Sequence, residues 1–332
     1  MSSSVESQKL IPPSQRNIVE ATLDIRQIRA FLAIADTGSV TRAAEVLHVV
    51  QPAVSRQLKL LEEDVGAPLF ERGRHGMVLT PDGRILMEHA RRALRELDSA
   101  RMEIRPTPGS IAGVVNVGLL PSSCELLAAP LVAALRAQYP GIQVSLSVGY
   151  TDHLSRWLES GEIDVALLYD PKPSPGLSVD PLLEEALSMC GPAAMGLRSD
   201  RPVKLEALGK APLVLPSQPH ILRGLVEHAC AVAGIHITVA AETNALSVQK
   251  DLVVQGLGLS VLPSVAISSE IERGLLCAAP IDQQEFSRRI VMALPTTRRT
   301  STAVRSVATV LQACMKEAVD SGVWVDSRWL AA

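Results

Sequence analysis

Four polar side chains between Gln51 and Lys59 have the types and spacing of a surface that reads DNA. Glutamine pairs with adenine and arginine with guanine in the major groove, while lysine binds phosphate. Gln51, Ser55, Arg56 and Lys59 therefore suit a mixture of base reading and positioning. The same pattern also fits an ordinary solvated helix face, so the neighbouring elements have to decide between the two interpretations.

Three helices are predicted around these side chains. Apolar spacing predicts the first over residues 23–38 and a second that Thr41 caps, and Pro52 fits the first turn of a third that runs to about Asp64. Residues 40–59 then have the length and turn of a helix-turn-helix, whose second helix enters the major groove.

A β-wing and a long helix are expected next. Residues 69–80 form two short extended pieces around a glycine-rich basic tip that contains Arg72 and Arg74, although Arg72 could instead pair with a nearby glutamate. Residues 81–105 predict a single helix of about 35 Å. One side of this helix is apolar and must be buried, either against a second copy of the chain or against the chain's own α/β domain. The apolar residues are Ile85, Leu86, Leu94 and Leu97.

The remaining chain predicts an α/β fold. Residues 106–110 combine prolines with a glycine and are expected to form a hinge. Strand-like runs then alternate with amphipathic helices over residues 111–316, which indicates a parallel sheet covered by helices, in two similar units. Residues 1–22 and the tail at 317–332 have no evident partner, and disorder is the default expectation for both.

Composition excludes several classes of protein. The 332 residues are 47% apolar and 20% charged, which is typical of globular proteins, and charges interrupt every apolar run before it reaches the roughly 20 residues of a membrane span. The five cysteines are odd in number and widely spaced, so neither disulfides nor a metal pair is expected, and the cytoplasm is the simplest location. No nucleophile elbow, P-loop or zinc-protease motif occurs, so we expect no enzyme and no cofactor.

The stretches 39–48 (SVTRAAEVLH), 51–58 (QPAVSRQL) and 69–72 (LFER), with Gly66 between them, resemble the LysR-type transcriptional regulators. The resemblance is nearly continuous over residues 23–80. Within the family, the chain is similar to the branch that includes nitrogen-assimilation and cysteine-biosynthesis regulators. It implies dimerisation through the long helix, with two recognition helices about 34 Å apart on the DNA. It also places these residues at or near DNA: Thr41, Arg42, Gln51, Pro52, Ser55, Arg56, Lys59, Arg72 and Arg74.

The family resemblance further implies an effector domain like the type 2 periplasmic binding proteins. It would have one subdomain at about 111–182 and 287–316, a second at about 183–286, and a small molecule in the cleft between them. Polar residues at strand ends are the candidates for that site, although N-capping alone explains any one hydroxyl there. The first choices are Ser122, Ser123, Thr151 and Ser217, followed by Asp170, Asn244 and Leu246.

A carboxylate or another anion is the expected ligand, because the site offers hydroxyls and helix N-termini, and no cage of aromatic rings is evident. The neighbourhood of Pro219 and His220 lacks the paired cysteines of peroxide-sensing family members, which leaves Cys230 as a lone thiol.

The sequence thus predicts a regulator that binds promoter DNA and an effector, forms dimers or tetramers, and contacts RNA polymerase. A solute-binding transport component would explain only residues 111–316. An enzyme with an attached DNA-binding module would explain both halves but lacks a catalytic constellation.

Overall fold

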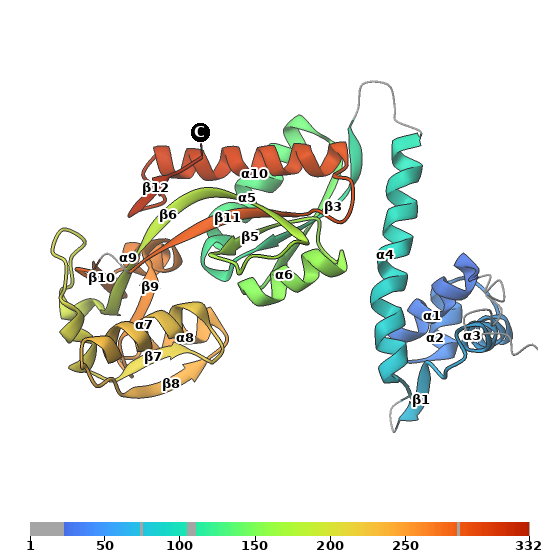
Figure 1. Ribbon diagram of the computed structural model, residues 1–332, viewed down its shortest axis with the longest axis horizontal. Helices are drawn as coiled ribbons and strands as arrows, with labels where there is room; N and C mark the ends of the chain where they lie inside the picture. The colour runs from blue at the N-terminus through green and yellow to red at the C-terminus, as the bar shows by residue number, and fades with distance from the viewer. Residues whose placement is uncertain (1–22, 74–75, 105–110, 284–285, 332) are drawn as a thin grey trace, which may run out of the picture. The chain divides into compact units, whose positions relative to one another are not determined.

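The computed structural model describes residues 23–73, 76–104, 111–283 and 286–331. The chain forms two compact units, Met1–Asp98 and Ser99–Ala332 (Figure 1). Residues 1–22, Arg74 of the expected wing tip and the expected hinge at 106–110 lie outside the described residues. In the part of the chain that is described, no helix is both long and apolar enough to cross a bilayer.

The first unit is a winged helix-turn-helix. Its elements are α1 (Ile25–Thr37), α2 (Val40–Val46), α3 (Gln51–Val65), β1 (Phe70–Gly73), β2 (Gly76–Leu79) and most of α4 (Pro81–Ile104), which continues past Asp98. Phe31, Ile34, Leu61 and Leu69 are fully buried at the centre of its core. Helix α1 ends at Gly38, whose φ of 65° is the left-handed conformation that favours glycine.

One helix cap differs from the sequence prediction. Ser39, and not Thr41, caps α2, because the Ser39 hydroxyl accepts a hydrogen bond from the backbone N–H of Arg42. Thr41 lies one residue inside the helix and is exposed. The helix ends at Val46, and Pro52 stands in the first turn of α3 as predicted.

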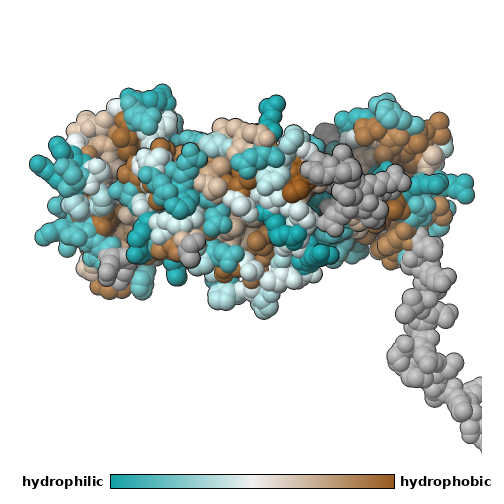
Figure 2. All heavy atoms as spheres, turned by 90° about the horizontal axis from the view of Figure 1, so that it is seen from above, coloured by the Kyte–Doolittle hydropathy of each residue, from teal (hydrophilic) through white to brown (hydrophobic). Residues whose placement is uncertain are grey.

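The apolar stripe of α4 is divided between two environments. Leu86 and Leu94 are half-buried and pack against the core of the first unit. Ile85 and Leu97 remain 59% and 45% exposed. Figure 2 shows hydrophobic residues, in brown, gathered on the surface of this unit. Of the predicted dimerisation stripe, Ile85 and Leu97 are therefore the members left most exposed in a single chain.

The second unit is a two-part α/β structure. Its first part contains β3 (Ala112–Leu119), α5 (Pro121–Gln138), β4 (Gly141–Val148), α6 (Thr151–Ser160), β5 (Val165–Tyr169), β11 (Ser287–Pro295) and α10 (Thr302–Asp320). Its second part contains β7 (Leu213–Pro216), α7 (Ile221–Val232), β8 (Val239–Thr243), α8 (Leu246–Val254), β9 (Ser260–Pro263), α9 (Ser268–Glu272) and β10 (Leu276–Pro280), with short 3₁₀ turns at Ala193–Met195, Leu205–Gly209 and Ser264–Ile267.

One strand, β6 (Leu177–Pro192), runs through both parts. It pairs with β11 up to Ala186 and with β9 and β10 from Leu187 onward. The sheet is mixed, because β3 is parallel to β4 and β5 whereas β11 is antiparallel to β5 and β6. The expectation of a parallel sheet is therefore confirmed for β3, β4 and β5 and for β7 and β8, while β6 and β11 add antiparallel strands that it did not include. Helices α5 and α10 cover one face of the sheet and α6 the other (Figure 1).

The C-terminal tail is folded, which corrects the default expectation of disorder. Helix α10 continues to Asp320, and β12 (Ser327–Trp329) pairs antiparallel with β6. Trp324 is only 1% exposed and belongs to the core of the first part. The tail lacks a sequence signal because its one strand is three residues long and its anchor is a single tryptophan.

Candidate functional site

The candidate DNA-reading face lies on the first two turns of α3 and the start of α2. Thr41, Arg42, Gln51, Pro52, Arg56 and Lys59 are exposed, while Ser55 is half-buried and accepts a hydrogen bond from the Gln51 amide at 3.2 Å. The buried face of α3 carries Val54, Leu58 and Leu61 instead. The helix thus presents its polar side outward as a groove-reading helix requires.

The cations of this face differ in whether they form ion pairs within the chain. Lys59 pairs with Glu63 at 3.6 Å, an exposed contact of little strength. Arg42, Arg56 and Arg72 form no ion pair with any residue in the described ranges. The alternative in which Arg72 pairs with a neighbouring glutamate therefore has no support in the structure.

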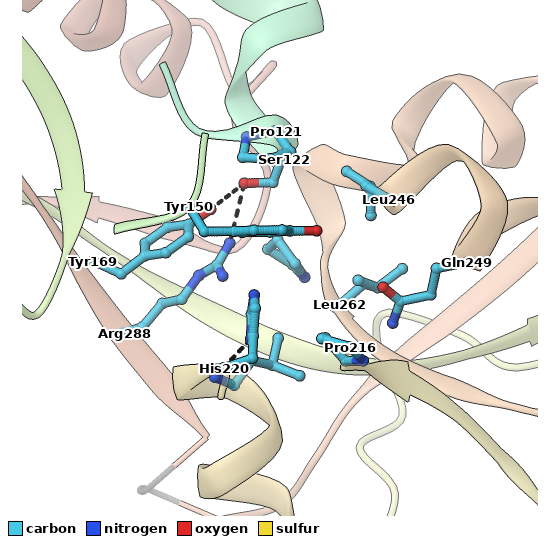
Figure 3. A pocket seen from close by; sticks show the side chains of 12 residues that line it. Pro121, Ser122, Tyr150, Tyr169, Pro216, His220, Leu246, Gln249, Leu262 and Arg288 are labelled. Atoms are coloured by element: carbon cyan, nitrogen blue, oxygen red, sulfur yellow. Dashed lines mark hydrogen bonds between the residues drawn. The ribbon is translucent and has the colours of Figure 1, made fainter. Parts of the chain in front are cut away.

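A second candidate site is a small pocket between the two parts of the second unit (Figure 3). It is lined by Pro121, Ser122, Tyr150, Tyr169, Pro216, His220, Leu222, Leu246, Gln249, Leu262, Pro263 and Arg288. Four helices begin here, since Pro121 opens α5, Tyr150 and His220 are the N-caps of α6 and α7, and Leu246 opens α8. Helix N-termini present free N–H groups and a positive dipole end, which favour an anion.

Arg288 supplies the charge of the pocket. Its Nε donates to Glu185 at 2.6 Å, its Nη2 donates to the Ser122 hydroxyl at 3.3 Å, and its guanidinium lies 3.6 Å from the centroid of the Tyr169 ring. The Ser122 and Tyr169 hydroxyls also hydrogen-bond each other. Nη1 makes no hydrogen bond with any residue that the structure describes. Nη1 is therefore a donor of this buried cation that no described residue uses.

Burial and charge keep the other titratable groups of the pocket neutral. Burial raises the pKa of Tyr169, so the phenol stays protonated. Burial and then the charge of Arg288 lower the pKa of His220 to about 4, against an opposing effect of Asp152. His220 Nδ1 accepts from the backbone N–H of Leu222, which leaves the proton of the neutral ring on Nε2. The pocket thus combines neutral donors with one cation.

His220 makes the protein sensitive to mild acid. Because its folded pKa of about 4 lies below the usual 6.5, the unfolded chain binds a proton as pH falls through 6.5 and the native state does not. Stability is therefore lost as pH falls below about 6.5. Asparagine also caps helices, so His220→Asn should keep the cap without the titrating ring. We therefore expect the thermal midpoint of His220→Asn to fall less between pH 7 and pH 5 than the thermal midpoint of the wild type does. An equal loss in both proteins would contradict this assignment.

Tyr150 forms the wall between this pocket and a larger groove. The pocket has a volume of about 30 Å³, room for one or two water molecules, whereas the groove holds about 550 Å³ and shares Pro121, Tyr150 and Leu246 with it. The Tyr150 hydroxyl donates to the Asn244 carbonyl across the gap at 3.0 Å, and its ring meets His220 edge-on at 4.7 Å. A metabolite does not fit in the pocket at this volume.

The structure brings only some of the predicted effector residues together. Ser122 and Leu246 line the pocket, and Asn244 lines the neighbouring groove. The Thr151 hydroxyl, in contrast, is buried and bonds the backbone N–H of Tyr169 at 3.0 Å, so it positions that strand end.

The other three predicted residues also lie away from the pocket lining. Ser123 is buried and bonds the Leu120 carbonyl, while Asp170 pairs with Arg289 at the surface. Ser217 bonds the Thr243 carbonyl through its backbone.

Sequence reasoning missed the residues that dominate the pocket. Arg288, Tyr169, Tyr150 and Gln249 were not among the candidates, and two of the three tyrosines of the chain meet here. Two tyrosines therefore line a site for which the sequence showed no evident cage of aromatic rings. The signal that could have found them is their position at strand and helix ends, which Tyr150 and Tyr169 share with Ser122.

Cys230 is buried in the second part, and burial raises the pKa of its thiol. A thiol that is protonated and inaccessible is a poor nucleophile, which agrees with the absence of a paired cysteine nearby in sequence.

Comparison with known proteins identifies both units. Residues 25–84 match the family described as bacterial regulatory helix-turn-helix protein, lysR family, and residues 108–315 match the LysR substrate binding domain. The chain is 30% identical to the HTH-type transcriptional regulator BbuR of Bordetella bronchiseptica over 86% of this chain and 87% of that protein. It is 31% identical to the nitrogen assimilation regulatory protein nac of Escherichia coli over 74% and 80%.

The crystal structure of full-length CbnR with its target DNA shares the fold, with a TM-score of 0.67 and 23% identity over 89% of this chain and 99% of that one. The family matches and the named relatives are regulators and not enzymes. The chain therefore belongs to the LysR family and is a DNA-binding transcriptional regulator with an effector-binding domain.

Proposed function

We propose that this regulator responds to a small anionic metabolite, most simply a carboxylate, which binds in the pocket around Arg288. The observation that carries the proposal is the uncommitted Nη1 of a buried arginine at a point where four helix N-termini meet. A carboxylate could accept from Nη1 and from backbone N–H groups at the start of α5 or α8. Charge-assisted hydrogen bonds of this kind are the strong ones in proteins.

Binding would be coupled to motion between the two parts of the second unit. The parts are linked at the pocket by the Tyr150–Asn244 hydrogen bond and by Lys250, which reaches Glu125 of α5 at 3.4 Å and Glu270 of α9 at 3.0 Å. Because the pocket is too small for a metabolite, the ligand would favour an arrangement in which these links have shifted. Such a ligand acts by shifting the population toward the arrangement it binds better.

The output would be altered binding to promoter DNA by an oligomer. The recognition helix α3 carries Arg56 and Gln51 as base-reading candidates, with Arg42, Lys59 and Arg72 placed to bind backbone. The exposed Ile85 and Leu97 of α4 would be covered by a second copy, and the effector domains would pair to give a tetramer. Contact with RNA polymerase would complete activation, and the protein would act in the cytoplasm.

The test uses the full-length protein, a DNA fragment that it binds, and a panel of small mono- and dicarboxylates beside their uncharged amides. We expect at least one carboxylate to raise the thermal midpoint and change DNA affinity, while its amide does neither. Ser122→Ala should lower the affinity for that ligand about 3- to 10-fold, because it removes one hydroxyl from the pocket. Ser217→Ala is the matched control, since Ser217 does not line the pocket. Amides as effective as the acids would rule out an anion.

A further inference from the structure

The C-terminal strap, residues 321–331, contacts the strand that carries Glu185, the ion-pair partner of Arg288. Its strand β12 pairs with β6 so that Ser327 lies opposite Glu185, and the Ala186 N–H donates to the Asp326 carbonyl at 2.9 Å. Arg328 pairs with Glu184 at 2.7 Å. The Ser264 hydroxyl, from the second part of the unit, donates to the Asp326 carboxylate at 2.7 Å. The strap therefore fixes the section of β6 that carries Glu185.

The side chain of Glu185 joins the strap to the pocket. Its carboxylate is buried with the residue 2% exposed, and one oxygen, Oε1, accepts from Arg288 at 2.6 Å. The other oxygen, Oε2, accepts from the indole N–H of Trp324 at 2.8 Å. A buried ion pair is tolerated only when further hydrogen bonds satisfy the remaining lone pairs. Trp324 provides that bond, and it also packs in the core.

We propose that Trp324 is a positioning residue of the effector pocket: by holding Glu185, it sets the place of the Arg288 guanidinium and thereby the affinity for an anion. The effect on anion affinity rests on the proposed function, whereas the positioning of Arg288 by Glu185 and Trp324 does not. The strap follows the residues 108–315 that match the family domain. Because Arg288 touches Glu185, Ser122 and the Tyr169 ring, a shift of its guanidinium by a fraction of an ångström would change all three contacts.

Two matched variants test the inference. Trp324→Phe keeps an aromatic ring in the core but removes the indole N–H. Trp329→Phe makes the same change in the same strap, where the indole has no hydrogen bond with any described residue. The first readout needs no ligand: the Nε–H resonance of Arg288 in a ¹⁵N-labelled protein, assigned by its absence from Arg288→Lys. We expect Trp324→Phe to shift or broaden it and Trp329→Phe to leave it unchanged. An unchanged resonance in Trp324→Phe would overturn the proposal.

The second readout is the affinity for the carboxylate that the panel identifies, or for formate and acetate if the panel identifies none. We expect Trp324→Phe to weaken binding about tenfold, and to weaken it no further in an Arg288→Lys background, because residues that act through one another are not additive. An equal loss in both backgrounds would overturn positioning through Arg288. If the resonance shifts but no anion binds the wild type, the proposed function fails and the positioning of Arg288 stands.

Discussion

Arg56→Ala is expected to lower the affinity of this regulator for its specific DNA sites about 10- to 100-fold, because one bidentate arginine–guanine contact is worth about 1–3 kcal/mol of discrimination. Arg56 is exposed on the first turns of α3, and no described residue pairs with it, so its guanidinium is free to enter a groove. Genome-wide mapping of bound DNA measures the effect directly. The wild type should give sharp peaks that share a dyad-symmetric motif.

The matched control removes an equal charge elsewhere. Arg136 lies exposed in the last turn of α5 in the second unit, and Arg136→Ala should keep every peak. Lys59→Ala is expected to weaken binding by a similar factor at all sequences and to reduce its salt dependence, as the loss of a phosphate contact does. Peaks that persist unchanged in Arg56→Ala would show that α3 does not read bases through this residue.

The DNA-binding unit was predictable because its signals are local. Gly38 and Gly66 adopt left-handed conformations that end α1 and α3, and Pro52 lies in the first turn of α3. A single residue therefore marks each of these helix boundaries in the sequence. Placing the cap of α2 at Thr41 failed for a similarly local reason. Ser39 and Thr41 are both good caps, and only the backbone conformation decides which hydroxyl reaches a free N–H.

The pocket was predictable only in part, because its charge comes from far along the chain. Ser122 follows β3 and could be read from the alternation of strands and helices. Arg288 contacts it from 166 residues away, on an antiparallel strand. Periodicity cannot pair such residues, since it predicts an element and not its neighbours.

Strand β6 escaped prediction because it does not read as a strand. It contains Pro181 and the adjacent Glu184 and Glu185, which break the alternation of apolar and polar residues. The proline lies beside a bulge, since Ile290 pairs with Leu183 and Val291 with Pro181, which leaves Leu182 without a partner on β11. A bulge of this kind leaves a residue unpaired and so tolerates a missing N–H.

Removing the charge of Arg288 is expected to have the largest effect on the effector response. Arg288→Met alone would leave Glu185 as a buried, unpaired carboxylate and would destabilise the fold. The informative variant is therefore Arg288→Met combined with Glu185→Gln, which removes both buried charges and keeps an oxygen for the Trp324 indole. Affinity for an effective carboxylate should fall about 100-fold, as for loss of a buried charged contact.

Three measurements on this double variant separate a ligand site from a structural pair. Its thermal midpoint without ligand should stay near that of the wild type, because replacing a buried ion pair by neutral groups of similar size is often neutral. Its binding to DNA without ligand should be unchanged, since the reading face belongs to the other unit. Only the ligand-induced changes should disappear. A double variant that folds, binds DNA and still responds to the carboxylate would place the anion outside the Arg288 pocket.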